Sequence, residues 1–489
     1  MAYTVEILPG RVAIQAEPGA NLLSVLRDAQ LAPEAPCGGH GTCKKCTVTV
    51  NGKEQLACQT EINADMTVSL PSLSRVHILE TGIDHGAPTA PRRDGYLLAI
   101  DIGTTTVVCY LLDGETGEEL AHASMLNPQS AYGADVISRI QAALRGEMNR
   151  LTEAIRTGLT TLIRQVCDEA KVPPSEIVLT CIVANPAMQQ LFLGISPGNL
   201  ATVPFAPVIT EAKIVPAKEY LPLCESAQMM IVPDVSGYVG ADTVGCVLST
   251  RMYASDKMTL MVDIGTNGEM VLGNKHRMTA CSTAAGPALE GANIRFGMRG
   301  AEGAIDHVWM EDGAIRCSVI GGGTARGICG SGLIDAVAVL LESGLINRRG
   351  RIQSLEEVDG QRVVWLTERI YLTQEDIREV QLAKGAIAAG IALMAKQLDI
   401  EQSQIDQVLL AGAFGSFLRP ESACRIGLLP PELLDKIVPV GNAAGSGAKR
   451  LVCDERLLEE AQKLVEKIEF IELADLPDFR RCFSVHMGL

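Results

Sequence analysis

The chain has 489 residues, with 58 acidic and 42 basic side chains, and a formal net charge of −16 at pH 7. This length allows about two to four domains, and a hydrophobic content of 47% excludes general disorder. The acidic balance argues against a nucleic-acid-binding protein, which needs a basic face to neutralise phosphates.

The sequence shows no targeting or membrane-spanning segment. The first residues lack the charged and then apolar pattern of a signal peptide, and no apolar run reaches the roughly 18 residues that a membrane span needs. Without an export signal, the fifteen cysteines are expected to be reduced thiols or metal ligands rather than disulfides. A cytoplasmic location without membrane contact is the expectation.

Residues 1–73 predict a small β-rich domain. Two alternating segments, TVEILPG at 4–10 and RVAIQAE at 11–17, flank a Pro-Gly turn, and a helical pattern follows at 21–31 with Asn21 as its cap. Residues 74–94 contain scattered histidines, prolines and an arginine pair with little periodicity. We therefore expect a flexible linker there.

From residue 95 onward, apolar strands alternate with helices, as in α/β proteins. The segments 97–113 (LLAIDIGTTTVVCYLLD) and 260–273 (LMVDIGTNGEMVLG) repeat one strand–turn–strand pattern. This repeat predicts two related subdomains, 95–255 and 256–450, with a cleft between them.

Two further segments have helical patterns. Residues 333–346 predict a buried helix, and residues 451–469 have the spacing of an amphipathic helix. Residues 451–489 are therefore expected to form a helix and a tail that pack on the duplicated domain.

Four cysteines near the N-terminus have the spacing C-x5-C-x2-C-x11-C, namely Cys37, Cys43, Cys46 and Cys58. The glycines between them let backbone amides turn toward a buried anionic cluster. Four thiolates from one loop and the strand after it suit a [2Fe–2S] cluster. A zinc site usually has two C-x2-C pairs, whereas this loop has one. Four incidental cysteines are improbable at this density.

The two Asp-Ile-Gly-Thr turns predict a nucleotide site. A glycine in a tight turn allows close approach to a phosphate, and the residues after it offer further donors. Asp101 and Asp263, at the strand ends, are candidates to hold the Mg²⁺ of a triphosphate, with a plain strand-end cap as the alternative. Two such turns in a chain without a Walker loop favour the nucleotide. The candidates are Gly103, Thr104, Thr105, Gly265, Thr266 and Asn267.

A third segment fits this site. Residues 408–417 (VLLAGAFGSF) predict a buried strand that runs into glycines suited to a nucleoside, with Gly412, Ala413 and Gly415 as candidates. Glu269 and Glu290 are candidates to orient the attacking water, and a structural role for each acid is the alternative.

These motifs resemble two known families. The cysteine spacing resembles that of ferredoxins over 1–73, and the turns resemble the actin, sugar kinase and heat-shock ATPase superfamily over 95–450. The segment GNAAGSGAK at 441–449 resembles the closing connector of that superfamily, which adds Gly441 and Asn442 to the nucleotide candidates. The resemblance implies an α/β and α+β protein: a β-grasp ferredoxin-like domain followed by a duplicated RNase H-like ATPase domain that binds ATP.

In combination, the two modules resemble the reductive activators of corrinoid proteins. The segments that carry this resemblance are 183–195, 237–248, 281–305 and 327–337. It implies ATP-dependent transfer of one electron from the [2Fe–2S] cluster to the inactive Co(II) corrinoid of a methyl-transferring protein, which restores Co(I). Longer family members insert a domain where this chain has only its linker.

The resemblance also bears on partners. An upstream electron donor is required, and a homodimer is allowed. Ser282 is a candidate to face the cobalt, with a cap or turn hydroxyl as the more ordinary alternative. Rival functions are an electron donor to a dehydratase, a small-molecule kinase, and a nucleotide-dependent redox switch without catalysis. Dehydratase activators carry a [4Fe–4S] cluster between subunits, and a kinase needs no cluster.

Overall fold

The computed structural model describes residues 2–8, 12–29, 31–33, 35, 39, 41, 46–70, 79–83, 93–265 and 267–489. The chain forms two compact units. The first contains 1–73, 93–209 and 214–229, and the second contains 74–92, 210–213 and 230–489. In the described part of the chain, no helix combines the length and the apolar character needed to cross a bilayer.

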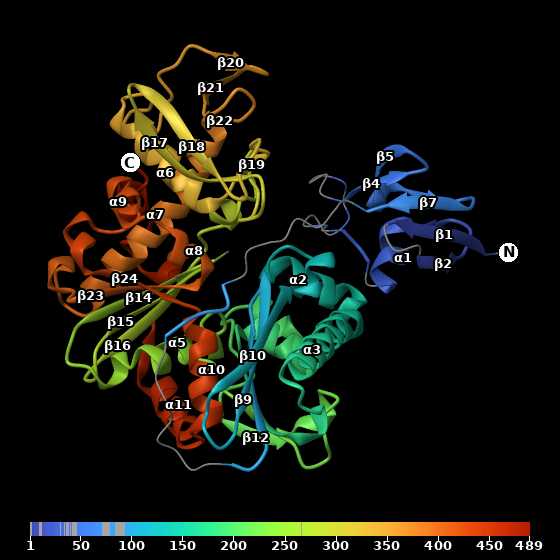
Figure 1. Ribbon diagram of the computed structural model, residues 1–489. Coiled ribbons are helices and arrows are strands. Elements are labelled where there is room, and N and C mark those ends of the chain that lie inside the picture. The colour runs from blue at the N-terminus through green and yellow to red at the C-terminus, as the bar shows by residue number, and fades with distance from the viewer. Residues whose placement is uncertain are drawn as a thin grey trace. The chain divides into compact units, whose positions relative to one another are not determined.

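The N-terminal part of the first unit is a five-stranded sheet with one helix, drawn in dark blue in Figure 1. The elements of this part, of which β3 and β6 lie outside the five-stranded sheet, are β1 (Tyr3–Leu8), β2 (Val12–Ala16), β3 (Ala20–Asn21), α1 (Leu22–Asp28), β4 (Thr47–Val50), β5 (Lys53–Leu56), β6 (Glu61–Ile62) and β7 (Met66–Ser69). The strand order is β2-β1-β7-β4-β5, in which the pair β1–β7 is parallel and the other pairs are antiparallel. This is the expected β-grasp arrangement.

Helix α1 forms where the sequence predicts it. The side chain of Asn21 accepts a hydrogen bond from the Ser24 amide at 3.3 Å and caps the first turn. Leu22, Leu23 and Leu26 are buried in the core of this domain. The helix ends at Asp28, three residues before the predicted end.

The rest of the first unit is a six-stranded sheet with helices against it. Its order is β10-β9-β8-β11-β13-β12. The elements are β8 (Tyr96–Ile102), β9 (Thr106–Asp113), β10 (Glu119–Leu126), α2 (Val136–Ala142), α3 (Met148–Ala170), β11 (Ile177–Ala184), α4 (Pro186–Leu193), β12 (Lys213–Pro216) and β13 (Gln228–Ile231). The long helix α3 packs against β9 and β10 through its apolar stripe.

The second unit is built around another six-stranded sheet, of order β24-β23-β14-β15-β16-β25. The strands of the whole unit, of which β17–β22 lie outside this sheet, are β14 (Thr259–Ile264), β15 (Gly268–Gly273), β16 (Met278–Thr283), β17 (Ala304–Glu311), β18 (Ala314–Val319), β19 (Gly327–Ile328), β20 (Glu357–Val358), β21 (Gln361–Trp365), β22 (Tyr371–Thr373), β23 (Gln407–Ala411), β24 (Ile437–Gly441) and β25 (Ile468–Phe470). Its helices are α5 (Ala241–Thr250), α6 (Gly330–Glu342), α7 (Gln374–Gln397), α8 (Gly412–Phe417), α9 (Pro420–Arg425), α10 (Ala443–Cys453), α11 (Arg456–Lys467) and α12 (Phe479–His486).

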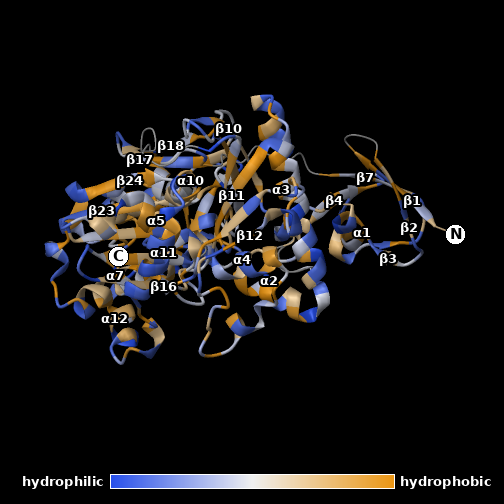
Figure 2. Ribbon diagram, turned by 90° about the horizontal axis from the view of Figure 1, so that it is seen from below, coloured by the Kyte–Doolittle hydropathy of each residue, from blue (hydrophilic) through white to orange (hydrophobic). Residues whose placement is uncertain are grey.

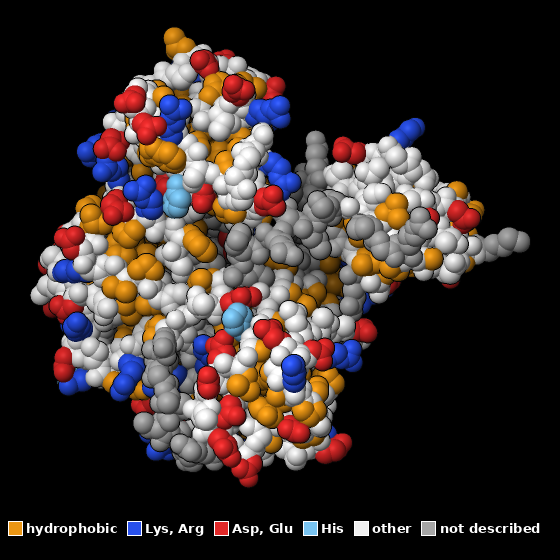
Figure 3. Space-filling view, in the orientation of Figure 1, with side chains coloured by type: hydrophobic (Ala, Val, Ile, Leu, Met, Phe, Trp, Pro, Cys, Tyr) orange, Lys and Arg blue, Asp and Glu red, His pale blue; other side chains and the backbone are white. Residues whose placement is uncertain are grey.

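The predicted duplication is confirmed by the two large sheets. In each, a hairpin (β8–β9 or β14–β15) is extended by a third antiparallel strand, and a parallel strand (β11 or β23) lies on the other side of the first strand. These inner strands are largely apolar, whereas surface helices such as α3 and α11 show both colours in Figure 2. Acidic and basic side chains are intermixed on the face shown in Figure 3.

The C-terminal region differs from its prediction. Residues 451–469 are not one helix, because α10 ends at Cys453 and α11 begins at Arg456. Asp454 interrupts the helical backbone with φ −139°, and its carboxylate binds the Arg456 guanidinium at 2.8 Å through both oxygens. The segment then adds β25, which pairs in parallel with β16. The apolar period continues across this break, so the pattern alone conceals it.

Helix α5 lies in the part of the chain that the sequence assigns to the first subdomain, yet it packs on α10 of the second unit. The two helices approach so closely that a Cβ added to Gly447 would lie 2.1 Å from the Gly245 carbonyl oxygen. Glycine is therefore required at this crossing, because any side chain would force the helices apart.

Candidate functional site

Two of the four predicted cluster ligands lie side by side in the N-terminal domain. Cys46 precedes β4, and Cys58 lies in the short 3-10 turn Ala57–Gln59. Their sulfurs are 3.3 Å apart and both side chains are buried. The Ala57 amide donates to the Cys46 carbonyl at 2.9 Å and holds the two segments together. Cys37 and Cys43 lie outside the described residues.

The surroundings of this pair fit an iron–sulfur cluster. Gly39 and Gly41 have φ of +97° and +76°, a left-handed backbone that glycine adopts without steric cost. Two thiols at this separation can share one iron, and four cysteines are the ligand set of a [2Fe–2S] cluster. Arg27 places nitrogen atoms without hydrogen-bond partners beside the same loop.

The first Asp-Ile-Gly-Thr turn lies between β8 and β9. The Gly103 amide donates to the Thr106 carbonyl at 2.9 Å. Two asparagine side chains brace the turn: Asn127 donates to the Gly103 carbonyl at 2.8 Å and Asn185 donates to the Thr104 hydroxyl at 3.0 Å. Neither asparagine is among the residues predicted from the sequence, although Asn185 lies in the segment 183–195 that carries the family resemblance.

The predicted residues Asp101 and Thr105 belong to the same turn. Asp101 is the penultimate residue of β8, half-buried and opposite Val108 of β9. The Thr105 carbonyl accepts a hydrogen bond from the Asn127 amide at 2.9 Å.

The second turn, between β14 and β15, is one residue shorter. Here the Gly265 amide donates to the Asn267 carbonyl at 2.8 Å, and Thr266 lies outside the described residues. Because strand residues directly opposite each other point to one face, the register aligns three polar side chains: Asp263 opposite Glu269, and Glu269 opposite Ser282. The Ser282 hydroxyl donates to Glu269 Oε1 at 3.4 Å.

Two more predicted elements meet this turn. Gly412 opens α8 with φ +77°, and a Cβ there would lie 2.4 Å from Asp263 Oδ1, so only glycine fits. A Cβ on Gly265 would lie 3.9 Å from Glu290 Oε1. The structure thus brings Asp263, Glu269 and Glu290 together at the second turn. Gly415 packs on Leu410 in α8, and Ala413 belongs to the backbone of that helix.

Two aspartates that the sequence analysis missed extend this acidic group. Asp234 follows β13 and is 1% exposed. Its Oδ1 accepts from the Ala241 amide at 3.1 Å, and its Oδ2 has no hydrogen-bond partner among the described residues. Asp242 lies in the first turn of α5 and is half-buried. Asp242 lies in the segment 237–248, which carries the family resemblance, but the sequence gives no reason to select this residue within it.

Burial raises the pKa of all four carboxyl groups, and the charge of Asp242 raises the pKa of the other three further. Loss of hydration raises the pKa of Asp263 to about 7 and that of Asp242 to about 6. Burial and then the charge of Asp242 raise the pKa of both Asp234 and Glu269 well above the usual range. None of the four forms an ion pair with a described residue. A bound cation would compensate the charge of this group and lower these pKa values.

The carboxyl groups at this turn could supply part of the ligands of a Mg²⁺ ion, but not a complete cage. Among the described residues, no three potential ligands converge tightly enough to hold a metal by themselves. Mg²⁺ commonly binds one or two carboxylates and takes its other ligands from phosphates and water. The half-buried Asp263 and Glu269 fit that pattern.

The described part of the linker lies against Gly441 and Asn442. The Asn442 amide donates to the Thr81 carbonyl at 2.9 Å, and the Ile83 amide donates to the Ser446 hydroxyl at 3.0 Å. A Cβ on Gly82 would lie 2.2 Å from Ser446 Oγ. Asn442 also caps α10 through its side chain.

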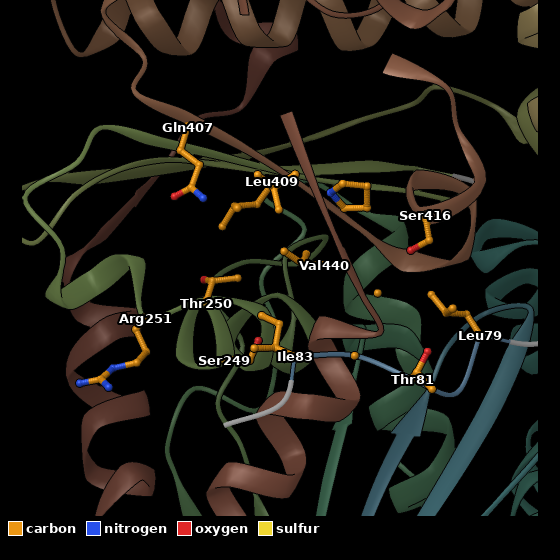
Figure 4. Close-up of a pocket in the computed structure, with 14 residues that line it drawn as sticks. Leu79, Thr81, Ile83, Ser249, Thr250, Arg251, Gln407, Leu409, Ser416 and Val440 are labelled. Atoms are coloured by element: carbon orange, nitrogen blue, oxygen red, sulfur yellow. The ribbon is translucent and has the colours of Figure 1, made fainter. Parts of the chain in front are cut away.

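A cavity of about 620 Å³ lies beside this contact. Leu79, Thr81 and Ile83 of the linker line it, and Figure 4 shows Gln407 and Leu409 of β23 across from them. Ser416 of α8 also lines the cavity. The linker thus contacts elements that carry the predicted nucleoside and connector motifs.

Comparisons with known proteins agree with this organisation. A family model for a 2Fe-2S iron-sulfur cluster binding domain matches residues 5–66, one for the RACo middle region matches 96–255, and one for the C-terminal ASKHA domain of RACo matches 257–489. The chain therefore has the architecture of an iron–sulfur protein joined to an ATPase of the ASKHA class.

Three relatives narrow this class. The corrinoid activation enzyme RamQ of Eubacterium limosum is 33% identical over 92% of this chain and 93% of its own length. The Co(II) methylated amine-specific corrinoid protein reductase of Methanosarcina barkeri is 27% identical over 76% of this chain and 73% of its own. The structure of a reductive activator for a corrinoid, iron-sulfur protein is 30% identical, with a TM-score of 0.72, over 100% of this chain and 98% of that one.

The chain belongs to the RACo family of reductive activators of corrinoid proteins. The function that the sequence resemblance implied, ATP-dependent activation of a Co(II) corrinoid protein, is confirmed. The individual nucleotide residues and the role of Ser282 stay predictions.

The raised pKa values predict how stability depends on pH. Between the unfolded pKa of an aspartate, 3.8, and about 7 for Asp263, the folded protein binds protons that the unfolded chain has released. Stability without Mg²⁺ and nucleotide should therefore fall as pH rises from 5.5 to 8. The thermal midpoint falls by roughly 2–4 °C for each kcal/mol lost, which calorimetry measures.

Glu269→Gln provides the control, because it removes one of the carboxyl groups whose pKa is raised by burial. Its stability should change less steeply with pH than that of the wild type. A wild-type stability that rises between pH 5.5 and 8 would contradict the crowding of the carboxyl groups.

Proposed function

We propose that this protein couples MgATP, bound at the two Asp-Ile-Gly-Thr turns, to the transfer of one electron onto the corrinoid cobalt of a methyltransferase-system protein. The observation that carries this proposal is that one chain joins the paired thiols of Cys46 and Cys58 to the crowded carboxyl groups at the Gly265 turn. The first set suits an electron carrier, and the second suits a metal–nucleotide complex.

The electron balance is simple. When bound by Cys37, Cys43, Cys46 and Cys58, a [2Fe–2S] cluster supplies one electron at low potential. The acceptor is the substrate Co(II), which becomes Co(I), and a separate low-potential donor returns the electron to this protein. Reduction of Co(II) by a cluster at an ordinary ferredoxin potential is unfavourable. Each 59 mV by which the potential of the acceptor lies below that of the cluster lowers the equilibrium constant for electron transfer tenfold.

The nucleotide side follows from the acidic group. Asp263 would hold the hydrated Mg²⁺, whose charge offsets the phosphates and the carboxylates together. Glu269 and Glu290 lie at the same turn and would orient the attacking water. Asp101 would be the second carboxylate on the Mg²⁺ side, the backbone amides of the turns would hold the phosphate oxygens, and α8 would face the nucleoside.

The relatives support a corrinoid protein as the partner. One relative's name specifies a methylated amine-specific corrinoid protein, and that of the related structure specifies a corrinoid, iron-sulfur protein. The hydroxyl of Ser282 donates a hydrogen bond to Glu269, so in this structure it lies on the side of the proposed nucleotide site. Contact between Ser282 and cobalt would require this hydrogen bond to break.

The linker offers a route from nucleotide to electron carrier. Gly441 and Asn442 are predicted nucleotide residues, and the Asn442 amide holds the linker through Thr81. A change at this connector therefore changes the anchor of the segment that leads back to the iron–sulfur domain. The coupling free energy of about 1–3 kcal/mol that is typical of allosteric sites changes an equilibrium constant for electron transfer by about one or two factors of ten.

Asp263→Asn tests the nucleotide assignment. The variant should keep the [2Fe–2S] EPR signal but lose ATP-dependent Co(I) formation by at least about tenfold, as for other altered metal sites. The assay mixes reduced protein with a Co(II) corrinoid protein under anaerobic conditions and follows the Co(I) absorbance with and without MgATP.

Asp312→Asn, in an exposed turn, is the matched control and should behave as the wild type. Cys58→Ser should lose both the EPR signal and the reduction. Full ATP stimulation in Asp263→Asn would exclude Asp263 from the nucleotide site, and reduction at the same rate without ATP in the wild type would refute the coupling.

Gly82→Val tests the linker route. The new side chain cannot fit between the linker and Ser446, so the linker should leave α10. We expect unchanged ATP binding and an unchanged cluster signal, but a several-fold weaker stimulation of Co(II) reduction by ATP. Gly300→Val is the control, because a Cβ there has no neighbour within 4 Å. Normal stimulation in Gly82→Val would rule out the anchored linker as the route.

A further inference from the structure

Arg27 is a half-buried cation next to the cluster loop. It lies in the last turn of α1. Its Nη2 is 4.0 Å from the position that a Cβ on Gly39 would take, and the same position is 3.8 Å from the Cβ of Cys58. The guanidinium and Cys58 thus both lie beside Gly39.

The guanidinium is only partly satisfied. Nε and Nη2 are buried, and neither has a hydrogen-bond partner among the described residues. Buried donors without partners are costly, with a penalty of about 1–3 kcal/mol or more for charged groups. Such donors therefore indicate acceptors that the polypeptide alone does not provide.

On its other side, Arg27 contacts an aromatic ring of the same unit. Its Cζ lies 5.3 Å from the centroid of the Tyr132 ring, within cation–π range. Tyr132 is 8% exposed, so the ring shields the guanidinium from water. Next to this contact, Asp28 pairs with Arg150 at 3.5 Å.

Electrostatics point the same way. Burial lowers the pKa of Arg27, while electrostatic interactions with Tyr132, Glu147, Cys46 and Cys58 counteract part of that effect. An arginine remains charged even so. The positive charge is therefore fixed beside two sulfurs that would carry the electron density of a reduced cluster.

We propose that Arg27 is a positioning residue for the iron–sulfur cluster, whose charge and N–H donors beside Cys46 and Cys58 set its reduction potential. This inference rests on the presence of the [2Fe–2S] cluster in the proposed function. Cluster potentials depend on net charge, hydrogen bonds to sulfur and solvent exposure. A fixed cation stabilises the reduced cluster, which has one more negative charge, and so raises the potential.

The test is an EPR-monitored redox titration of the full-length protein, with its cluster, in the wild type and in Arg27→Gln. The variant keeps a planar polar group but lacks the charge. Its equilibrium constant for reduction should fall at least tenfold, a shift of 59 mV toward more negative potential for one electron. An intact signal with an unchanged midpoint would overturn the proposal.

Three further variants separate charge from folding. Arg27→Lys keeps the charge and should shift less than Arg27→Gln. Lys53→Gln removes an exposed charge from the same domain and should leave the midpoint unchanged. An equal shift in Lys53→Gln would overturn the proposal, because the effect would then not be specific to Arg27.

Tyr132→Leu keeps both arginine and cluster ligands but removes the shielding ring. It should shift the midpoint in the same direction as Arg27→Gln, by a smaller amount, because water weakens the effect of the charge. This variant decides the question if Arg27→Gln fails to hold a cluster: an unchanged midpoint would then overturn the proposal. Absence of a [2Fe–2S] signal in the wild type would instead refute the proposed function.

Discussion

The crowding of four carboxyl groups in the second unit is the constraint on which the nucleotide site depends. Burial raises the pKa of Asp234, Asp242, Asp263 and Glu269, the charge of Asp242 adds to this at the other three, and none is paired with a described cation. Such a group is stable only when it holds protons or a metal ion. In the proposed function, Mg²⁺ with a nucleotide would offset this charge, so the charge imbalance that the fold maintains would favour its binding.

The duplicated hairpins show how the two halves have diverged. In the first half, Asp101 lies opposite Val108; at the matching place in the second half, Asp263 lies opposite Glu269. The first turn is also one residue longer, and asparagine side chains brace it. The second half therefore carries the excess negative charge, whereas the first offers a braced turn of backbone and hydroxyl groups.

Much of this organisation could be predicted from local patterns. Apolar runs ending in Asp-Ile-Gly-Thr determine both hairpins, and the cap at Asn21 determines the start of α1. Asp234 and Asp242 could not be selected, because they come from a loop and a helix that only tertiary packing brings beside Asp263. The break at Asp454 was hidden by a continuous apolar period, and the docking of the linker depends on contacts with residues over 350 positions away.

Proton release on nucleotide binding measures the central claim directly. Calorimetric titration of MgATP into the protein at pH 7, repeated in buffers with different ionisation enthalpies, yields the number of protons exchanged. If the cation binds the crowded carboxyl groups, protons held by Asp263 and its neighbours must leave, and binding should release protons and tighten as the pH rises. Binding without proton release, with an affinity independent of pH between 6 and 8, would contradict the account.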